Sequence, residues 1–445
     1  MELEKKYKKF LLSKKSSFLS HAISKVHTTY SDVLNRDNFS WKILKKLVFF
    51  FDNGKLRIHK NINYKIIILS NIISIKEIKN DLYFGNLDKI FRKNKINSLK
   101  VYRNHTNHRS GKIRKFLKDK NSILLNKRLD ILSEILIFYL FIKETLIFIF
   151  SDKYYLIKEN LLLKDFLSII PNLRLIYQVK KIIKIVKPKA IIFTFEGHAW
   201  ERLLTYYCKN NDAKIVSIAY QFSILKKNQY GLFYNLKHDY NPDFIATSGT
   251  IPYQIIKEKN KNSNLIKLGS SKFIKPQKKT TKKIDLLVTL DTDYNKFKYL
   301  LDMLKKIISK NQSLKITLRP HPISKNDKIF MRDILKNING FKNLSLSSKS
   351  LEIDLKNSRY LLFTDSAISI TALNYNVIPL FFKYKNNINF FGKNFPKKNI
   401  IKNHIDLDKK INKGRDNLNY YFNNFRDNYF EKYKIKKIKN ILDKL

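Results

Sequence analysis

Two short segments in the second half of the chain carry side chains suited to binding a phosphate. The first is Leu-Arg-Pro-His-Pro at residues 318–322, which follows an expected strand. Arg319 and His321 offer N–H donors that can neutralise a departing phosphate, and the two prolines stiffen the loop. The same loop could also be a rigid strand-to-helix turn with a solvated arginine and histidine, so the residues alone leave both interpretations open.

The second segment is Thr-Asp-Ser-Ala-Ile-Ser at residues 364–369, which follows another expected strand and begins a helix. A helix N-terminus presents free N–H groups and a positive dipole end, so small hydroxyl residues there can contact a phosphate. Asp365 or Ser366 would equally serve as an ordinary N-cap. Both segments fall on one edge of the expected sheet, which favours a joint phosphate site made of Arg319, His321, Asp365, Ser366 and Ser369.

A candidate general base lies in the first half of the chain. Residues 194–202 read Thr-Phe-Glu-Gly-His-Ala-Trp-Glu-Arg, between an expected strand and an expected helix. A transfer reaction to a hydroxyl acceptor benefits from a base within reach of that hydroxyl, and Glu196 or His198 would serve. In the structural alternative, Glu196 caps the helix and Trp200 packs in the core.

Strands and helices alternate through most of the chain, as in a doubly wound parallel sheet. The first series is followed by a polar stretch at 270–283 that contains a proline and no apolar period, which is typical of a linker. A second series then begins at residue 284. The region from about 71 to 172 is less regular, and its topology does not follow from the sequence. In the first series we expect strands at 64–69, 190–195, 214–219, 243–247 and 265–268 and helices at 173–187, 199–209 and 253–259; in the second, strands at 284–290, 314–318, 344–346, 360–364 and 377–382 and helices at 294–310, 325–337, 351–357 and 366–374.

The predicted fold is therefore α/β, with two tandem Rossmann-like domains and a ligand-binding cleft between them at the carboxyl ends of the two sheets. We expect an N-terminal acceptor-side domain at 1–270 with an irregular helical insertion, a linker at 271–283 and a C-terminal nucleotide-donor domain at 284–402. The last segment, 403–445, is expected to be helical and to cross back onto the first domain.

The phosphate-binding segments resemble the donor half of GT-B-type bacterial surface-polysaccharide transferases. These include the capsule sialyl- and Kdo-transferases, with their His-Pro and paired-serine motifs, and the polyol-phosphate transferases. The matches are His321 with Pro322, and Ser366 with Ser369, which two residues separate here. The resemblance implies that these side chains hold the phosphate of a nucleotide-linked donor, such as a CMP-sugar, and that no further cofactor is needed.

The first-domain segment Glu-Gly-His-Ala-Trp-Glu-Arg is similar to a segment of surface-carbohydrate biosynthesis proteins, and Glu196-Gly197 to the acidic-Gly motif that holds the base in bacterial sialyltransferases. Many such transferases carry a histidine after the next strand, where this chain has Tyr220-Gln221-Phe222. This departure shifts the role of the base to Glu196 and His198.

Asp-Thr-Asp at 291–293 resembles the metal-binding motif of the other large glycosyltransferase class. It lies at the first turn of a Rossmann pattern, where Asp293 is a reasonable N-cap for the next helix. We therefore predict a metal-independent reaction.

A net charge of +53 raises the question of a nucleic-acid partner. The basic residues are spread over the whole length, and no zinc-finger, RNP-like or basic-zipper pattern is present, so nucleic acid is an unfavoured partner. Anionic lipid head groups and phosphorylated substrates use the same charge. With a single cysteine, Cys208, and a charged N-terminus that lacks an apolar signal core, the sequence favours the cytoplasm.

The most apolar stretch, 131–150, has nearly the length of a membrane span but contains Glu134, Lys143 and Glu144. The preferred interpretation is a buried helix. The alternative is an interfacial helix on the inner leaflet, which would place the protein peripherally on the inner membrane.

Together, these features predict a glycosyltransferase that moves a sugar from a nucleotide-activated donor to a lipid-linked or oligosaccharide precursor of a capsule, lipopolysaccharide or O-antigen. Polyol-phosphate transfer, which reuses the same donor half, is the competing enzyme function. A non-catalytic basic scaffold on membrane or nucleic acid is the alternative from a different class.

Overall fold

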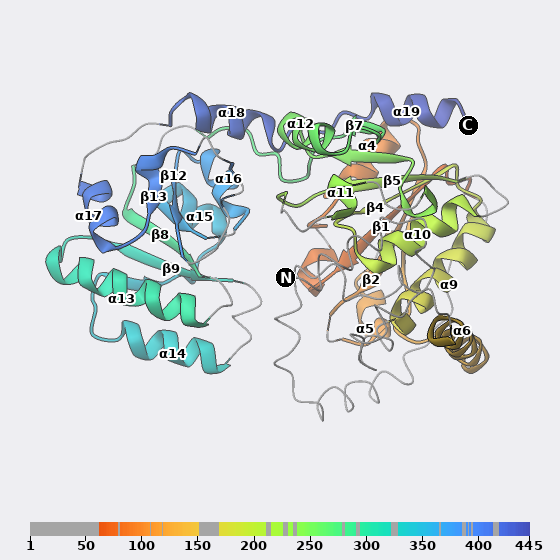
Figure 1. The fold of residues 1–445 in the computed structure, drawn as a ribbon, viewed down its shortest axis with the longest axis horizontal. Coiled ribbons are helices and arrows are strands. Elements are labelled where there is room, and N and C mark those ends of the chain that lie inside the picture. The colour runs from red at the N-terminus through yellow and green to blue at the C-terminus, as the bar shows by residue number, and fades with distance from the viewer. Residues whose placement is uncertain are drawn as a thin grey trace. The chain divides into compact units, whose positions relative to one another are not determined.

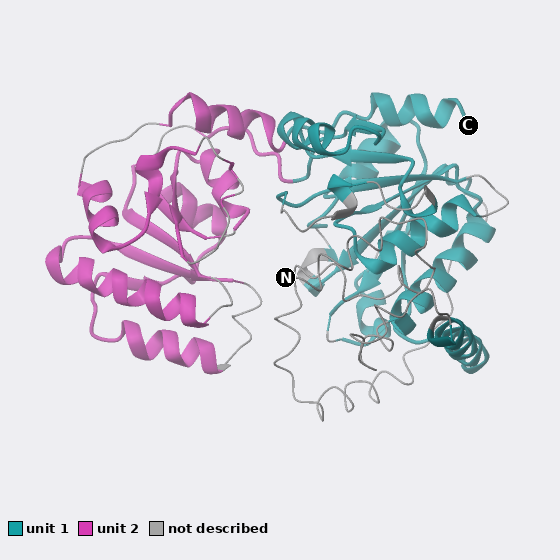
Figure 2. Cartoon of the chain, in the orientation of Figure 1, with its two compact units in different colours: residues 1–271, 431–445 teal, residues 272–430 magenta. Residues whose placement is uncertain are grey.

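The computed structural model describes residues 62–445, except for 79–80, 107, 118, 151–168, 211–214, 226–229, 235–237, 278–280, 291–293, 322–327, 365, 385–388, 390, 393–394 and 413–417. The chain forms two compact units (Figure 2). Unit 1 comprises residues 1–271 and 431–445, and unit 2 comprises residues 272–430.

Unit 1 is built on a parallel sheet of seven strands in the order β3-β2-β1-β4-β5-β6-β7 (Figure 1). The order reverses between β1 and β4, as in a Rossmann fold. The strands are β1 (Ile66–Ile72), β2 (Ser98–Asn104), β3 (Ser122–Leu124), β4 (Ala190–Thr194), β5 (Val216–Gln221), β6 (Phe244–Thr247) and β7 (Leu265–Lys267). The helices are α4 (Leu87–Lys93), α5 (Ser110–Arg114), α6 (Ile131–Phe150), α9 (Ile169–Val186), α10 (Ala199–Lys209), α11 (Tyr230–Phe233), α12 (Thr250–Lys259) and α19 (Lys436–Asp443), with short 3-10 turns at Ile75–Ile78 and His238–Tyr240.

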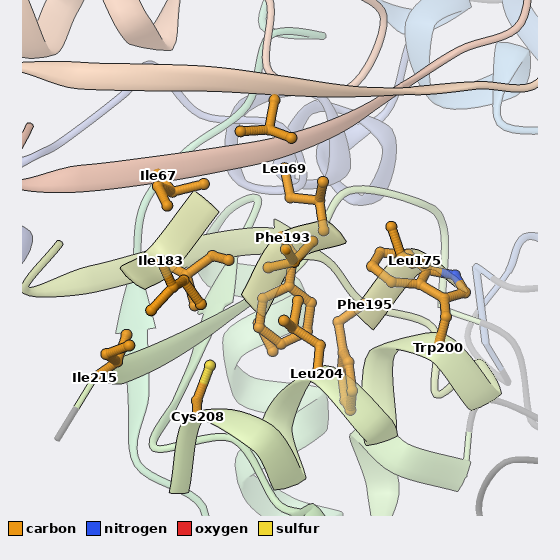
Figure 3. Close-up of a cluster of buried hydrophobic side chains, with 14 of the residues drawn as sticks. Ile67, Leu69, Leu175, Ile183, Phe193, Phe195, Trp200, Leu204, Cys208 and Ile215 are labelled. Carbon is orange, nitrogen blue, oxygen red and sulfur yellow. The ribbon is translucent and has the colours of Figure 1, made fainter. Parts of the chain in front are cut away.

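Helices cover both faces of this sheet, which explains why its central strands are largely apolar. Alternate residues of β1 enter two different cores: Ile67 and Leu69 pack with α9 and α10, whereas Ile66 and Ile68 pack with α4 and α19. Figure 3 shows the first of these cores, in which Phe193 of β4 lies among side chains of the neighbouring helices.

The region that the sequence left unplaced supplies one side of the sheet. β2 carries Lys100, a polar residue in a central strand, and its ammonium is buried between two carboxylates. Lys100 Nζ lies 3.2 Å from both Asp81 Oδ2 and Asp88 Oδ1. A buried cation needs such partners, because an unpaired charge in the interior is costly.

Unit 2 repeats the same topology with six parallel strands in the order β10-β9-β8-β11-β12-β13. The order reverses between β8 and β11, so the two-domain Rossmann-like α/β fold predicted from the sequence is confirmed. The strands are β8 (Ile284–Leu290), β9 (Ile316–Pro320), β10 (Leu344–Leu346), β11 (Ser358–Phe363), β12 (Ile378–Phe382) and β13 (Ile400–Ile401). The helices are α13 (Tyr294–Lys310), α14 (Lys328–Ile338), α15 (Leu351–Asn357), α16 (Ile368–Leu373), α17 (His404–Asn412) and α18 (Tyr420–Asn428), with a 3-10 turn at Lys397–Asn399.

The last residues of the chain return to unit 1. Ser270 N donates to Glu431 O at 2.8 Å, and the Glu431 carboxylate accepts from Thr250 N at 2.7 Å, which caps α12. Gly269 has a φ of +93°, and a Cβ built there would lie 2.4 Å from Lys432 O. Beyond this crossing, Ile438 and Leu442 of α19 are buried in the unit 1 core. Of the last segment, residues 431–445 are thus an integral part of unit 1, whereas residues 403–430 belong to unit 2.

The helix predicted at 131–150 is present as α6, but the prediction that it is buried is wrong. Its inner row, which includes Ile137 and Phe141, packs against the rest of unit 1, whereas eleven of its large apolar side chains are exposed. The nearly uniform apolar sequence gives no indication of which face is covered. Among the described residues, no helix is both long and apolar enough to cross a membrane.

Candidate functional site

The residues predicted as a general base lie at the point of unit 1 where the strand order reverses. The loop after β4 carries Glu196 and His198, next to the end of β1, since Leu69 pairs with Phe193 in the sheet. His198 Nε2 lies 3.1 Å from Glu196 Oε2. The Glu196 side chain is 12% exposed and that of His198 is 31% exposed. The structure therefore brings the two candidates together as one accessible pair.

The loop that presents this pair is held by a carboxylate that the sequence did not single out. Glu201, in the first turn of α10, accepts three backbone N–H groups through Oε2: those of Glu196 at 2.9 Å, Gly197 at 2.8 Å and His198 at 2.7 Å. Gly197 adopts a φ of +88°, a conformation that glycine allows at little cost. The capping role considered for Glu196 belongs to Glu201, which leaves the Glu196 carboxylate to face His198.

A buried arginine holds the other side of the same loop. Arg202 is fully buried, and its Nη1 donates to Gly197 O at 2.6 Å. Burial lowers the pKa of Arg202 to about 9, although the negative charge of Glu201 acts to raise it. The loop is thus bonded on both its N–H and its carbonyl side, which preorganises the Glu196–His198 pair.

Burial and charge shift the proton affinities of the site. Burial raises the pKa of Glu201 to about 7, against the charge of His198 and the backbone hydrogen bonds, which lower it. For His198, burial acts to lower the pKa, but the carboxylates of Glu201 and Glu196 outweigh it and the net pKa is raised. His198 therefore holds a proton at a higher pH than a free histidine does.

Two further residues of the site come from the region that the sequence left unplaced. His105 follows β2, and its Nε2 lies 3.2 Å from Asn71 Oδ1 of β1. The His105 side chain is exposed, and desolvation by the neighbouring protein atoms, together with the positive charges of Arg103, Lys127 and His198, lowers its pKa. Arg103 stacks on Trp200, with its guanidinium carbon 4.6 Å from the ring centre.

These residues give the carboxyl edge of the unit 1 sheet a neutral imidazole, a guanidinium and a carboxylate–imidazole pair. Burial lowers the pKa of Arg103 to about 10, against the charge of Glu201, so it stays cationic at neutral pH. The sequence contains a pattern that could have identified Arg103 and His105: Ser98–Tyr102 is mostly apolar, as in a strand, and is followed by Arg-Asn-His. Lys100 in the middle of this run obscures the strand.

The Tyr220-Gln221-Phe222 segment stands where the resembled transferases have their histidine loop. Its first two side chains point into the interior of unit 1. The Tyr220 hydroxyl donates to Gly269 O at 3.0 Å, and Gln221 Oε1 accepts from Ser248 N at 3.1 Å. Both side chains are fully buried. They support the fold and provide no base.

In unit 2, the two segments predicted to bind phosphate lie on the same edge of the sheet. β9 ends at Pro320 and β11 at Phe363, and β8 lies between them with Leu290 beside Pro320. His321 follows β9 and is exposed, and Ser366 precedes α16 and is half-buried. The Ser366 hydroxyl oxygen accepts from Ile368 N at 3.3 Å. This edge contains the switch point of unit 2, where open α/β sheets bind ligands.

Two of the predicted donor residues make internal contacts. Arg319 Nη1 lies 2.5 Å from the buried carboxylate oxygen Oδ2 of Asp354 and 3.1 Å from Ser347 Oγ. Ser369 is fully buried, and its hydroxyl donates to Ser366 O at 2.8 Å. Asp365, like the Asp-Thr-Asp segment at 291–293, lies outside the described residues.

Comparisons with known proteins concern the fold. No protein-family model matches the chain, and no curated protein matches it. Among solved structures, the UDP-GlcNAc 2-epimerase of Methanocaldococcus jannaschii is 13% identical, with a TM-score of 0.49 over 85% of this chain and 99% of that one. TarM, known from S. aureus, is 14% identical, with a TM-score of 0.47 over 87% of this chain and 100% of that one. At these identities the likeness is one of fold alone.

Proposed function

We propose that the protein is a metal-independent glycosyltransferase that moves a sugar from a nucleotide-activated donor to a hydroxyl of a surface-polysaccharide precursor. The observation that carries the proposal is the Glu196–His198 pair, presented by a rigid loop at the switch point of unit 1. The second support is the resemblance of the His321-Pro322 and Ser366 segments to the donor half of GT-B-type transferases. Both segments follow strands that end on the same edge of the unit 2 sheet.

In this reaction the Glu196–His198 pair removes the proton of the acceptor hydroxyl. The acceptor oxygen bonds to the anomeric carbon of the donor sugar, and the bond from that carbon to the phosphate oxygen breaks. The nucleotide leaves with the electron pair, and the proton remains on the Glu196–His198 pair. A preorganised loop favours this step because the base needs no rearrangement as charge develops.

His321 and the Ser366 hydroxyl are proposed to donate hydrogen bonds to the departing phosphate. Arg319 and Ser369 act as positioning residues in this proposal. Arg319 fixes the end of β9 through Asp354, and Ser369 fixes the backbone of Ser366. Asp365 is proposed to complete the donor loop.

The test is thermal stabilisation of the full chain by CMP, CDP, UDP and GDP. A ligand that binds the folded state raises apparent stability by mass action, so the panel also identifies the base. We expect one nucleotide to shift the unfolding midpoint and His321→Ala to abolish that shift. His404→Ala, a histidine of α17 in the same unit, is the matched control and should leave it intact.

The outcomes separate the function classes. A shift by UDP or GDP would favour sugar transfer over polyol-phosphate transfer from a CDP-linked donor, since UDP and GDP are the nucleotides that such sugar donors release. The absence of any shift, in a chain shown to be folded by its cooperative unfolding, would contradict the proposal and favour a non-catalytic scaffold.

A further inference from the structure

The outer face of α6 is the largest concentration of exposed apolar side chains in the described part of the chain. Eleven of its 23 exposed large apolar side chains belong to this one helix. Soluble proteins rarely expose contiguous apolar patches of this kind, and larger ones mark sites of interaction. The α6 face consists of Ile131, Leu132, Ile135, Leu136, Phe138, Tyr139, Ile142, Leu146, Ile147, Ile149 and Phe150.

The acidic residue near the start of α6 is turned toward the protein. Glu134 forms a bidentate ion pair with Arg174 of α9: Oε1 lies 2.7 Å from Nε, and Oε2 lies 2.6 Å from Nη2. Glu144, near the other end, is half-buried, and its charge acts on buried Tyr240. Lys143, in contrast, is exposed. The exposed charge within the helix is therefore positive.

The helix that packs beside α6 adds to this positive charge. α9 exposes Lys180, Lys181 and Lys184, and Lys181 Nζ lies 3.5 Å from Ser133 Oγ at the start of α6. Figure 1 shows α6 and α9 at the edge of unit 1. An apolar helix face flanked by lysines matches a bilayer whose interior is apolar and whose surface is anionic.

We propose that the α6 face inserts into the interfacial region of an anionic lipid bilayer. The helix lies in the plane of the membrane, because its inner row, with Ile137 and Phe141, stays packed on unit 1. At about 1.5 Å per residue, its 20 residues offer an apolar edge about 30 Å long. The proposal does not depend on the proposed reaction, although it would bring unit 1 to a lipid-linked acceptor.

The first experiment measures flotation of the full chain with vesicles of phosphatidylcholine alone and of phosphatidylcholine mixed with phosphatidylglycerol, without nucleotide. We expect binding to the mixed vesicles and weaker binding to the neutral ones. The double variant Leu132→Gln/Phe138→Gln should lower the partition coefficient at least about tenfold, since each side chain loses its transfer from water to the apolar phase.

The matched control is Ile329→Gln/Tyr420→Gln, which removes two exposed apolar side chains from unit 2. It should bind the mixed vesicles as the unmodified chain does. Equal binding of both double variants, equal binding to both kinds of vesicle, or no binding at all would overturn the proposal. Because no nucleotide is present, these outcomes are independent of the outcome for the proposed function.

A second measurement identifies what covers the face. Cys208 is buried and burial raises its thiol pKa, so a cysteine introduced by Phe138→Cys can be labelled selectively with an environment-sensitive fluorophore. We expect a blue shift when mixed vesicles are added, and none for the same label at Tyr420→Cys.

Two results of this measurement, and one result on the oligomeric state of the chain in solution, would contradict a lipid partner. One is an unchanged emission on addition of vesicles. Another is an emission already blue-shifted in buffer, which would indicate a segment of this chain on the face. The third is a dimer that Leu132→Gln/Phe138→Gln dissociates, which would assign the face to a second copy.

Discussion

Replacing Glu201 by glutamine should remove a pH dependence from the stability of unit 1. Folding raises the pKa of this buried carboxyl from 4.5 to about 7, so the folded state binds its proton more tightly than the unfolded state does. The resulting stabilisation is complete below about pH 4.5, declines as the pH rises, and is lost above about pH 7. At about 1.4 kcal/mol per pKa unit, the loss amounts to about 3 kcal/mol.

His198 contributes in the same direction, because its pKa is also raised and its stabilisation is lost as the pH rises through that pKa. Glu201→Gln removes the first contribution and reduces the second, since Glu201 is the largest charge that raises the pKa of His198 and Glu196 continues to raise it. The glutamine carbonyl still accepts from the loop backbone. We therefore expect the variant to gain about 3 kcal/mol on the unmodified chain between pH 4.5 and pH 8.

The assay is urea unfolding followed by tryptophan fluorescence in a Trp41→Phe background, where the remaining Trp200 reports on unit 1. The repulsion between the many lysines changes with pH in both proteins, so only the difference between them is used. Two unfolding free energies that stay parallel from pH 4.5 to pH 8 would refute the reasoning. Glu201→Ala serves as the control for the hydrogen bonds. It leaves three backbone N–H groups without their acceptor and should be destabilised by several kcal/mol at every pH, at about 1–3 kcal/mol for each.

Three further predictions concern the crossing of the chain, the donor loop and the base. A non-glycine residue in the left-handed backbone conformation costs about 1–2 kcal/mol of stability. Gly269→Ala should destabilise unit 1 by clearly more than this, because its Cβ meets Lys432 O, whereas Gly340→Ala, with a similar φ and open space around it, should cost only that amount. Thermal unfolding compares the two variants. Arg319→Met should lower the free energy of unfolding in urea by about 3–5 kcal/mol, because it leaves the buried Asp354 carboxylate without its cation. Arg319→Met/Asp354→Leu should recover most of this loss, and a double variant as unstable as the single one would argue against the ion pair. Glu196→Gln should lower the pKa that governs the acid limb of the pH profile of kcat/KM, because it removes a negative charge that raises the pKa of His198. An acid limb with the same pKa in both proteins would exclude His198 as the titrating group.

The sequence predicts those strands and helices that are buried through an uninterrupted run of apolar residues or a regular apolar pattern. The strand expected at 190–195 and the helix expected at 199–209 correspond to β4 and α10 almost residue for residue. β2 was missed because it carries Lys100, whose burial depends on Asp81 and Asp88 in another part of the chain. Pairing of this kind follows from tertiary structure and leaves no local pattern.

The same limit applies to the candidate sites. Proximity in sequence suggested Glu196 and His198, and the structure joins them, but three N–H donors made available by a left-handed Gly197 decide that Glu201 is the cap. The partner of Arg319, Asp354, lies on α15, and nothing near residue 319 in the sequence indicates it. The phosphate-binding roles of His321, Asp365 and Ser366 stay predictions.

The most direct test of the proposed activity is transfer of labelled sugar from CMP-, UDP- and GDP-sugars to a bacterial lipid and polysaccharide extract by the full chain. We expect transfer from one class of donor. Glu196→Gln should lower its rate at least about hundredfold and leave the stabilisation by the matching nucleotide unchanged, since the base acts on the acceptor. Transfer at an undiminished rate by both Glu196→Gln and His198→Gln, or no transfer from any donor although a nucleotide binds, would contradict the account.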